Sequence, residues 1–187
     1  MLPILPFVGS ILRRFRRNRR GSAAVEFALV APIFFALLFA IIETAMVFFA
    51  SQVLETVTQD SARIIMTGQA QAASYTPAQF KSLVCGRIVA LFDCANGISV
   101  DVRSYPTFSS VTITDPIDAG KNFTAAGLKY CPGREGDIVV VRLFYQWPLF
   151  VTGLGYNIAN LAGGKRLLTA TAAFRNEPFA DLGPTCS

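Results

Sequence analysis

The sequence predicts an α+β fold with a long N-terminal helix, a second short helix and a small antiparallel sheet of about four strands. Three observations lead to this prediction. A long uncharged apolar run lies near the N-terminus, helical periodicity continues beyond it, and apolar and polar residues alternate in the C-terminal half. A helix that packs on a sheet is a stable way to bury the apolar faces of both.

The amino-acid composition excludes several structural and functional classes. The chain has 187 residues, of which 52% are hydrophobic and only 16% charged, against about 25% charged in a typical soluble domain. This composition excludes a disordered chain. The sequence contains no histidine, which excludes a histidine-based catalytic triad and a histidine-ligated zinc site.

The net charge of +5 comes from a short N-terminal cluster of six arginines. These residues are Arg13, Arg14, Arg16, Arg17, Arg19 and Arg20. A nucleic-acid-binding surface usually spreads basic residues over a folded face, whereas this cluster directly precedes the most apolar part of the chain. We therefore expect a cytoplasmic basic flank of a membrane segment and no nucleic-acid partner.

The membrane segment is predicted over residues 28–50. No charged residue occurs between Phe27 and Ile42, and after Glu43 and Thr44 the apolar run resumes as far as Ala50. As a helix, residues 28–50 would be about 34 Å long, which is enough to cross a hydrocarbon core of about 30 Å. A cleaved secretory signal peptide is the alternative, but no A-x-A-like site follows the run, which is also too long.

Two carboxylates flank this run and interrupt its apolar character. Glu26 and Glu43 are candidate intramembrane acidic residues, because a carboxylate in a bilayer is costly and needs a partner. For Glu43, a position near the outer interface, within reach of water, is the equal alternative. Pro32 lacks a backbone donor and predicts a kink or an early break in the helix.

The helix is predicted to continue to about Gly68, so that the whole helix covers residues 22–67. Beyond Ala50, apolar or small residues recur at helical spacing: Leu54, Val57, Ser61, Ile64 and Ile65. Glycine suits the position after a helix end. A short linker helix is the alternative.

The remaining elements follow from local signals. Thr76 and Pro77 suit an N-cap and a first helical position, and the helix they begin has an apolar face of Phe80, Leu83, Val84, Ile88 and Leu91. Alternation and β-branched content predict strands at residues 98–102, 110–114, 138–147 and 167–175. Residues 115–136 are rich in Gly, Pro, Asp and Lys and predict a loop.

A short motif joins the arginine cluster to the apolar run. Gly21 follows the arginines, Ser22 comes next, and Glu26 stands five residues after the glycine. This arrangement resembles the processing signal of type IV pilins and pseudopilins. The longer string RRGSAAVEFALVAPIFFALLFAIIE is similar to the TadE-like family, minor pseudopilins of the tight-adherence (Flp) pilus system. The resemblance covers about Arg19 to Gly68, with a weaker one at Thr169–Pro178, and Ser22 departs from the phenylalanine of ordinary pilins.

The resemblance implies a role in assembling a pilus for surface attachment. A prepilin peptidase would cut after Gly21, leaving Ser22 as the new N-terminus and Glu26 to pair with an N-terminal amine. The implied partners are the bacterial inner membrane, the prepilin peptidase, other pseudopilins and the pilus-assembly machinery. The chain would then divide into a leader (1–21), a long helix (22–67) and a periplasmic domain (68–187). An uncleaved, membrane-anchored periplasmic scaffold or receptor is the alternative.

Four cysteines follow the helix, at Cys85, Cys94, Cys131 and Cys186. In a periplasmic domain we expect disulfides, because a zinc site would need C-x-x-C spacing or histidine. Three connectivities are possible, and we favour Cys85–Cys94 with Cys131–Cys186, since a turn at Asp93 would return Cys94 to the helix that carries Cys85.

An enzymatic function has little support in the sequence. The aspartates are scattered, and most stand where turns are expected: Asp93, Asp101, Asp115, Asp118 and Asp137. Asp115 and Asp118 lack the pattern of an EF-hand and fit a solvated turn better than a calcium site. We expect no enzyme, no cofactor, no metal and no small-molecule substrate. A membrane-tethered hydrolase is the rival, and it would need a pocket with convergent titratable groups.

Overall fold

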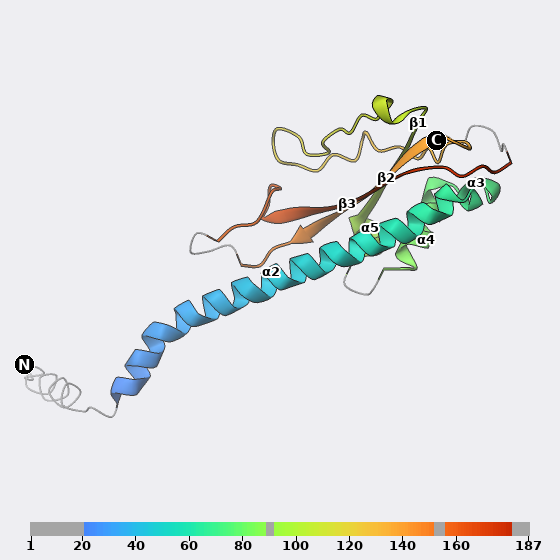
Figure 1. Ribbon diagram of the computed structural model, residues 1–187. Helices are drawn as coiled ribbons and strands as arrows, with labels where there is room; N and C mark the ends of the chain where they lie inside the picture. The colour runs from blue at the N-terminus through green and yellow to red at the C-terminus, as the bar shows by residue number, and fades with distance from the viewer. Residues whose placement is uncertain (1–20, 89–91, 152–155, 181–187) are drawn as a thin grey trace, which may run out of the picture. The chain divides into compact units, whose positions relative to one another are not determined.

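The computed structural model describes residues 21–88, 92–151 and 156–180. The chain forms two compact units that meet between Ile42 and Glu43, and each is described by itself. The first unit contributes the N-terminal half of helix α2 (Ser22–Met66). The second contains the rest of α2 and the α+β domain (Figure 1).

Helix α2 confirms the expected long helix and runs through Pro32 without interruption, so an early break at that proline is wrong. The helix ends because Gly68 adopts a left-handed conformation with φ of 76°. A Cβ atom at Gly68 would also lie 2.6 Å from the Phe179 ring, so glycine is required here both for conformation and for space.

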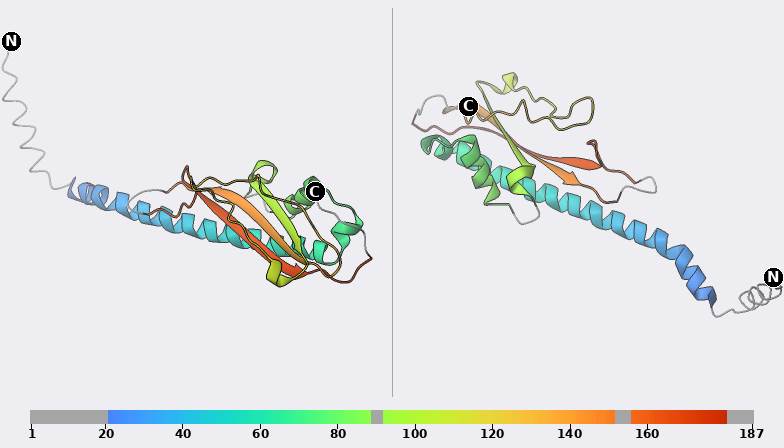
Figure 2. Two further views of the ribbon diagram at one scale, coloured as in Figure 1. Left: turned by 90° about the horizontal axis from the view of Figure 1, so that it is seen from above. Right: turned by 180° about the vertical axis from the view of Figure 1, so that it is seen from behind.

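Within the second unit, one face of α2 packs on a three-stranded antiparallel sheet (Figure 2). Leu54, Val57, Ser61 and Ile65 are buried, which confirms the helical periodicity read from the sequence. The sheet has the order β1-β2-β3, with β1 (Ile98–Tyr105), β2 (Ile138–Pro148) and β3 (Lys165–Arg175).

The strand expected at residues 110–114 is wrong, and the sheet has three strands among the described residues instead of about four. Residues Phe108–Ser110 form a 3₁₀ turn, η2. The carbonyl groups that follow accept hydrogen bonds from side chains, Thr112 from the Tyr105 hydroxyl and Thr114 from Arg142. These bonds replace the ladder that a neighbouring strand would supply.

Three short helices connect α2 to the sheet: α3 (Gln69–Ala72), α4 (Pro77–Cys85) and α5 (Cys94–Gly97). The predicted start of α4 is confirmed, since Thr76 and Gln79 form a reciprocal capping box with Pro77 in the first turn. The helix ends at Cys85, which is earlier than the apolar face predicts, and Leu91 lies outside the described residues.

The long loop predicted at residues 115–136 covers the sheet face opposite α2 (Figure 1). On that face Phe144 packs with Leu161 and Leu167, and Phe123 from the loop lies 5.6 Å from the Phe144 ring. Strand β2 is therefore buried on both faces, which explains its nearly continuous apolar sequence.

Candidate functional site at the N-terminal helix

The Gly21–Glu26 motif lies at the exposed start of α2. Gly21 directly precedes the helix, and Ser22 is its first residue. A Cβ atom at Gly21 would meet nothing within 4 Å, in contrast to the crowded Gly68. Within the described residues, neither the backbone conformation nor the space around it requires glycine at position 21. The six arginines of the basic flank lie outside the described residues.

Glu26 stands one helical turn after Ser22 and is exposed. Within the described residues its carboxylate makes no hydrogen bond or ion pair. It is also the one charged side chain between residues 21 and 42. A carboxylate on an apolar helix is costly to place in lipid and favours a charged or hydrogen-bonding partner.

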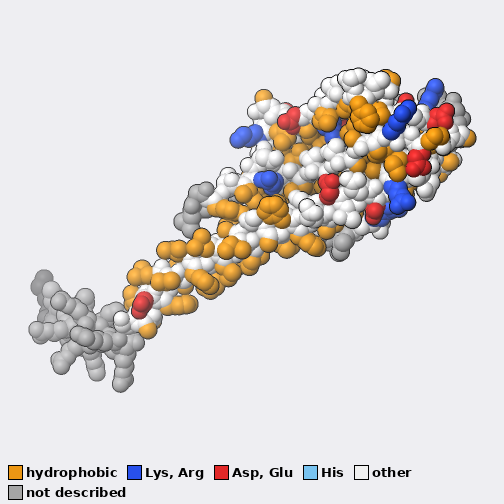
Figure 3. Space-filling view, viewed as in Figure 1, with side chains coloured by type: hydrophobic (Ala, Val, Ile, Leu, Met, Phe, Trp, Pro, Cys, Tyr) orange, Lys and Arg blue, Asp and Glu red, His pale blue; other side chains and the backbone are white. Residues whose placement is uncertain are grey.

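The N-terminal half of α2 exposes apolar side chains around the whole helix, and Figure 3 shows those on one face. Phe27 is 67% exposed, Leu29 70% and Ile41 67%. A helix that is apolar on all sides is stable in a lipid bilayer or a protein core but not in water. Of the described helices, α2 is the one long and apolar enough to cross a membrane.

Glu43 differs from Glu26 because the fold supplies its partners. The side chain is buried, and its carboxylate accepts hydrogen bonds from the backbone N–H groups of Phe150 (2.5 Å) and Val151 (3.2 Å). The next residue, Thr44, shares a hydrogen bond with the Tyr156 hydroxyl. Sequence reasoning found Glu43 but not these partners, since nothing local indicates a loop 107 positions away.

A disulfide joins Cys85 and Cys94, the pairing favoured above, with a Cα–Cα distance of 5.6 Å. The turn at Asp93 has the expected role. The Asp93 carboxylate caps α5 by accepting a hydrogen bond from the Asn96 amide. Cys131 is disulfide-bonded as well, and Cys186, its expected partner, lies outside the described residues.

Asp101 is the aspartate whose setting the sequence did not indicate. It is fully buried on β1 opposite Arg142 of β2. Its carboxylate accepts hydrogen bonds from Arg142, from Arg103 and from the Lys129 amide. The two guanidinium groups also donate to the loop carbonyls of Thr114 and Gly127. This cluster thus attaches the long loop to the sheet. The position of a charged residue within the alternating pattern of β1 is the sequence signal that could have indicated this buried cluster.

Other aspartates occupy turns, as the sequence predicts. Asp115 accepts a hydrogen bond from the Ile117 amide and Asp137 from the Arg134 amide. The Asn122 amide donates to Asp118, and this bond holds the pKa of the Asp118 carboxyl below its usual value. The described residues contain no cluster of three or more potential metal ligands.

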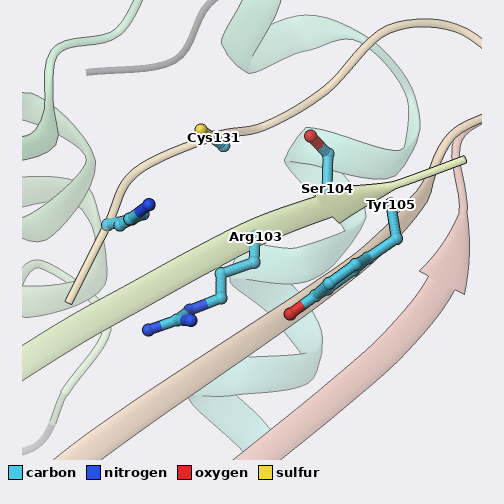
Figure 4. Close-up of a pocket in the computed structure, with 5 residues that line it drawn as sticks. Arg103, Ser104, Tyr105 and Cys131 are labelled. Carbon is cyan, nitrogen blue, oxygen red and sulfur yellow. The ribbon is translucent and has the colours of Figure 1, made fainter. Parts of the chain in front are cut away.

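A small depression of about 210 Å³ lies beside β1 (Figure 4). Its lining is Arg103, Ser104, Tyr105, Lys129 and Cys131. Arg103 is engaged by Asp101 and the Gly127 carbonyl, and Cys131 is oxidised. The Tyr105 hydroxyl donates a hydrogen bond to the Thr112 carbonyl, so three of the five lining residues already have partners in the fold.

Comparison with known protein families gives a match at the N-terminal helix. The family model described as TadE-like protein matches residues 21–63, the segment that contains Gly21, Glu26 and most of α2. No curated protein and no solved structure matches the chain. TadE-like proteins are pilus components, are not known as an enzyme family, and connect the chain at family level with the Tad/Flp pilus system. The resemblance to the TadE-like family that the sequence indicates is confirmed over residues 21–63, which match the family model.

Proposed function

We propose that this chain is a minor pseudopilin that acts in assembling an Flp (tight-adherence) pilus for surface attachment. One observation carries the proposal: within the segment that matches the TadE-like family, an exposed Gly21–Glu26 motif begins a helix that is apolar on all sides. The part of that helix before Glu43 has no protein cover within the described residues and therefore needs lipid or other subunits around it.

The proposed topology follows from charge. Six arginines precede the apolar run, whereas Arg63 is the first basic residue after it. The positive-inside rule then gives a cytoplasmic N-terminus, a single span of the inner membrane and a periplasmic domain. The Cys85–Cys94 disulfide is compatible with that compartment. A C-terminal reporter that is active only in the periplasm should be active, and cytoplasmic activity would reverse the topology.

The proposed processing step is cleavage after Gly21 by a prepilin peptidase. A glycine with open space around it lets an extended backbone enter a narrow protease cleft. The new Ser22 ammonium and the Glu26 carboxylate would each need a partner in an apolar setting. In an assembly, the carboxylate of one subunit supplies that partner for the ammonium of its neighbour.

The test is the N-terminal sequence of the full protein recovered from membranes of cells with and without the prepilin peptidase. We expect Ser22 first in the former and an uncleaved N-terminus in the latter. Gly21→Val should block cleavage, whereas Gly127→Val, at another glycine with open space, should not. An intact N-terminus in pilus-competent cells would instead favour an uncleaved anchored scaffold or receptor.

A further inference from the structure

The loop that follows β2 presents an aromatic side chain to solvent. Phe150 is 85% exposed, more than any other large hydrophobic side chain among the described residues. Its neighbours Leu149 and Val151 are half-buried. An exposed aromatic side chain between apolar neighbours favours contact with another apolar phase.

Hydrogen bonds to two separate elements hold this loop. The Glu43 carboxylate of α2 accepts from the Phe150 and Val151 amides. On the other side, the Leu149 amide donates to the Gly164 carbonyl, just before β3. The backbone on both sides of the Phe150 side chain is thus fixed, so its exposure is built into the fold.

The same hydrogen bonds fix the position of the Phe150 loop along the axis of α2, next to Glu43. Glu43 directly follows Ile42, the last residue of the uncharged apolar run. One and two turns later, Met46 and Phe49 are also exposed, while Val47 and Ala50 are buried in the domain. Phe150 is therefore tied to the point of α2 where apolar exposure changes from all sides to one side.

Basic residues lie at the same end of the sheet. In the β2–β3 register, Lys165 pairs with Pro148 and Arg166 with Trp147. Lys165 is exposed, and Arg166 donates a hydrogen bond to the Ile158 carbonyl. Lysine and arginine near a bilayer are attracted by anionic headgroups, and phenylalanine is among the residues that interfacial segments bury at the boundary between headgroups and acyl chains.

From these observations we propose that Phe150 inserts into the phospholipid surface from which α2 emerges, as a second membrane contact of the domain. The proposal rests on membrane anchoring by α2. The lipid surface is favoured over another occupant because the chain is continuous from the exposed apolar run to Glu43, which binds the loop directly. Two contacts, one helix and one loop, would fix the orientation of the domain on the membrane.

Quenching by brominated lipids tests the proposal in the full chain. Trp147 is replaced by Phe, and a single tryptophan is then introduced as Phe150→Trp, Phe34→Trp or Phe108→Trp. Phe34 lies in the apolar run, and Phe108 is a matched control, 65% exposed but on η2. The protein is reconstituted in two sets of vesicles of phosphatidylethanolamine and phosphatidylglycerol, with bromine near the headgroup end of the acyl chains in the first set and near their methyl end in the second.

In the first set we expect quenching at least twofold stronger for Phe150→Trp than for Phe108→Trp, and in the second set we expect Phe34→Trp to be quenched. If Phe34→Trp is quenched and Phe150→Trp behaves like Phe108→Trp, the loop proposal is overturned while membrane anchoring stands. If Phe34→Trp is not quenched, both the loop proposal and membrane anchoring by α2 fail. The tryptophan emission of Phe150→Trp could also shift to shorter wavelength as the protein density in the vesicles rises, without quenching by bromine. This result would show that a second copy of the chain covers the loop, and it would overturn the lipid proposal.

Trp147 is buried and packs with Phe92 and Tyr145, so the parent variant is first checked for its native disulfide and circular dichroism. Should it misfold, Phe150→Cys and Phe108→Cys replace it in the chain that retains Trp147. Each new thiol is labelled with an environment-sensitive dye, since the structure contains no free cysteine in its described part. The same twofold difference in lipid quenching is then required.

Discussion

Asp101 and Arg142 face each other across β1 and β2, with 2.6 Å between a guanidinium nitrogen and a carboxylate oxygen. Both side chains are buried. A pair of this kind rarely adds much net stability, but removal of one partner leaves a buried charge without compensation. The pair also joins the sheet to the long loop, because Lys129 and Thr114 bind to the same cluster.

Asp101→Ala should therefore lower the free energy of unfolding by about 3–5 kcal/mol. Chemical denaturation of the full chain in detergent, followed by circular dichroism, measures this loss. The double variant Asp101→Leu/Arg142→Met removes both charges and should recover a large part of it. Asp60→Ala, at an exposed position on α2, is the control and should change stability by less than about 0.5 kcal/mol. Equal losses in the single and double variants would contradict the role of the unpaired charge.

Glu43→Ala should release the loop at Phe150 by removing the acceptor of two backbone amides. Leaving buried donors unsatisfied costs about 1–3 kcal/mol. Glu43→Gln keeps one acceptor oxygen and should lie between Ala and the native residue. Hydrogen exchange at Phe150 and Val151 in the full protein is the measurement, and Glu55→Ala on the same helix is the control. Unchanged protection of both amides in Glu43→Ala would refute this assignment.

The raised pKa of Tyr130 predicts that the protein loses stability in strong alkali. Burial, with a smaller effect of Tyr75, raises the pKa of Tyr130 from 10.0 to about 12. The folded state thus keeps its proton up to about pH 12, whereas the unfolded chain releases it above about pH 10. Stability from this group is complete below pH 10 and is lost as pH rises to about 12, by at most about 2–3 kcal/mol.

Tyr130→Phe should remove that part of the pH dependence. Because the Tyr130 hydroxyl is buried and has no hydrogen-bond partner in the described structure, the substitution should be neutral or stabilising at pH 7. The difference in unfolding free energy between the two proteins, measured from pH 8 to 12, isolates Tyr130 from the other tyrosines. A constant difference across this range would show that Tyr130 titrates normally.

The Cys85–Cys94 disulfide closes a short loop, with a sequence separation of 9. Cys85→Ser/Cys94→Ser should reduce stability by about 2–3 kcal/mol, since the unfolded chain regains the entropy of the closed loop. Thermal unfolding of the full chain measures the loss. Thiol titration of the native protein should detect no free thiol at Cys85 or Cys94, and reactive thiols there would contradict the oxidised state.

Glu26→Ala should separate processing from assembly. We expect normal cleavage after Gly21, because the peptidase would read the glycine and its basic flank. The variant should lose the pairing of Glu26 with an N-terminal ammonium. The unpaired ammonium would cost about 3–5 kcal/mol of assembly free energy, and lipid headgroups and water would reduce this cost. Co-purification with partner pseudopilins and surface attachment should fail, while Glu55→Ala retains both. Normal attachment in a cleaved Glu26→Ala strain would remove the assembly role.

Features that depend on local pattern can be predicted from the sequence alone. The apolar run of α2, its periodic face through Ile65, the capping box at Thr76 and the central strand β2 all have signals within a few residues. Helical periodicity and caps depend on neighbours three or four residues apart, so a single sequence contains them. The Gly21–Glu26 motif is local in the same way, and the family match covers it.

Contacts between groups that are distant in the sequence depend on the packed fold. In the sequence Glu43 is an isolated carboxylate, and only in the fold do the amides of the loop at Phe150 bind it. Asp101 is likewise one of several scattered aspartates in the sequence, and only the sheet register places Arg142 opposite it. The strand expected at 110–114 failed for the same reason. Its composition allows a strand, but Tyr105 and Arg142 bind its carbonyl groups. Such partners are set by register and loop closure across the sheet, which depend on the whole packed core and leave no periodic trace in the sequence.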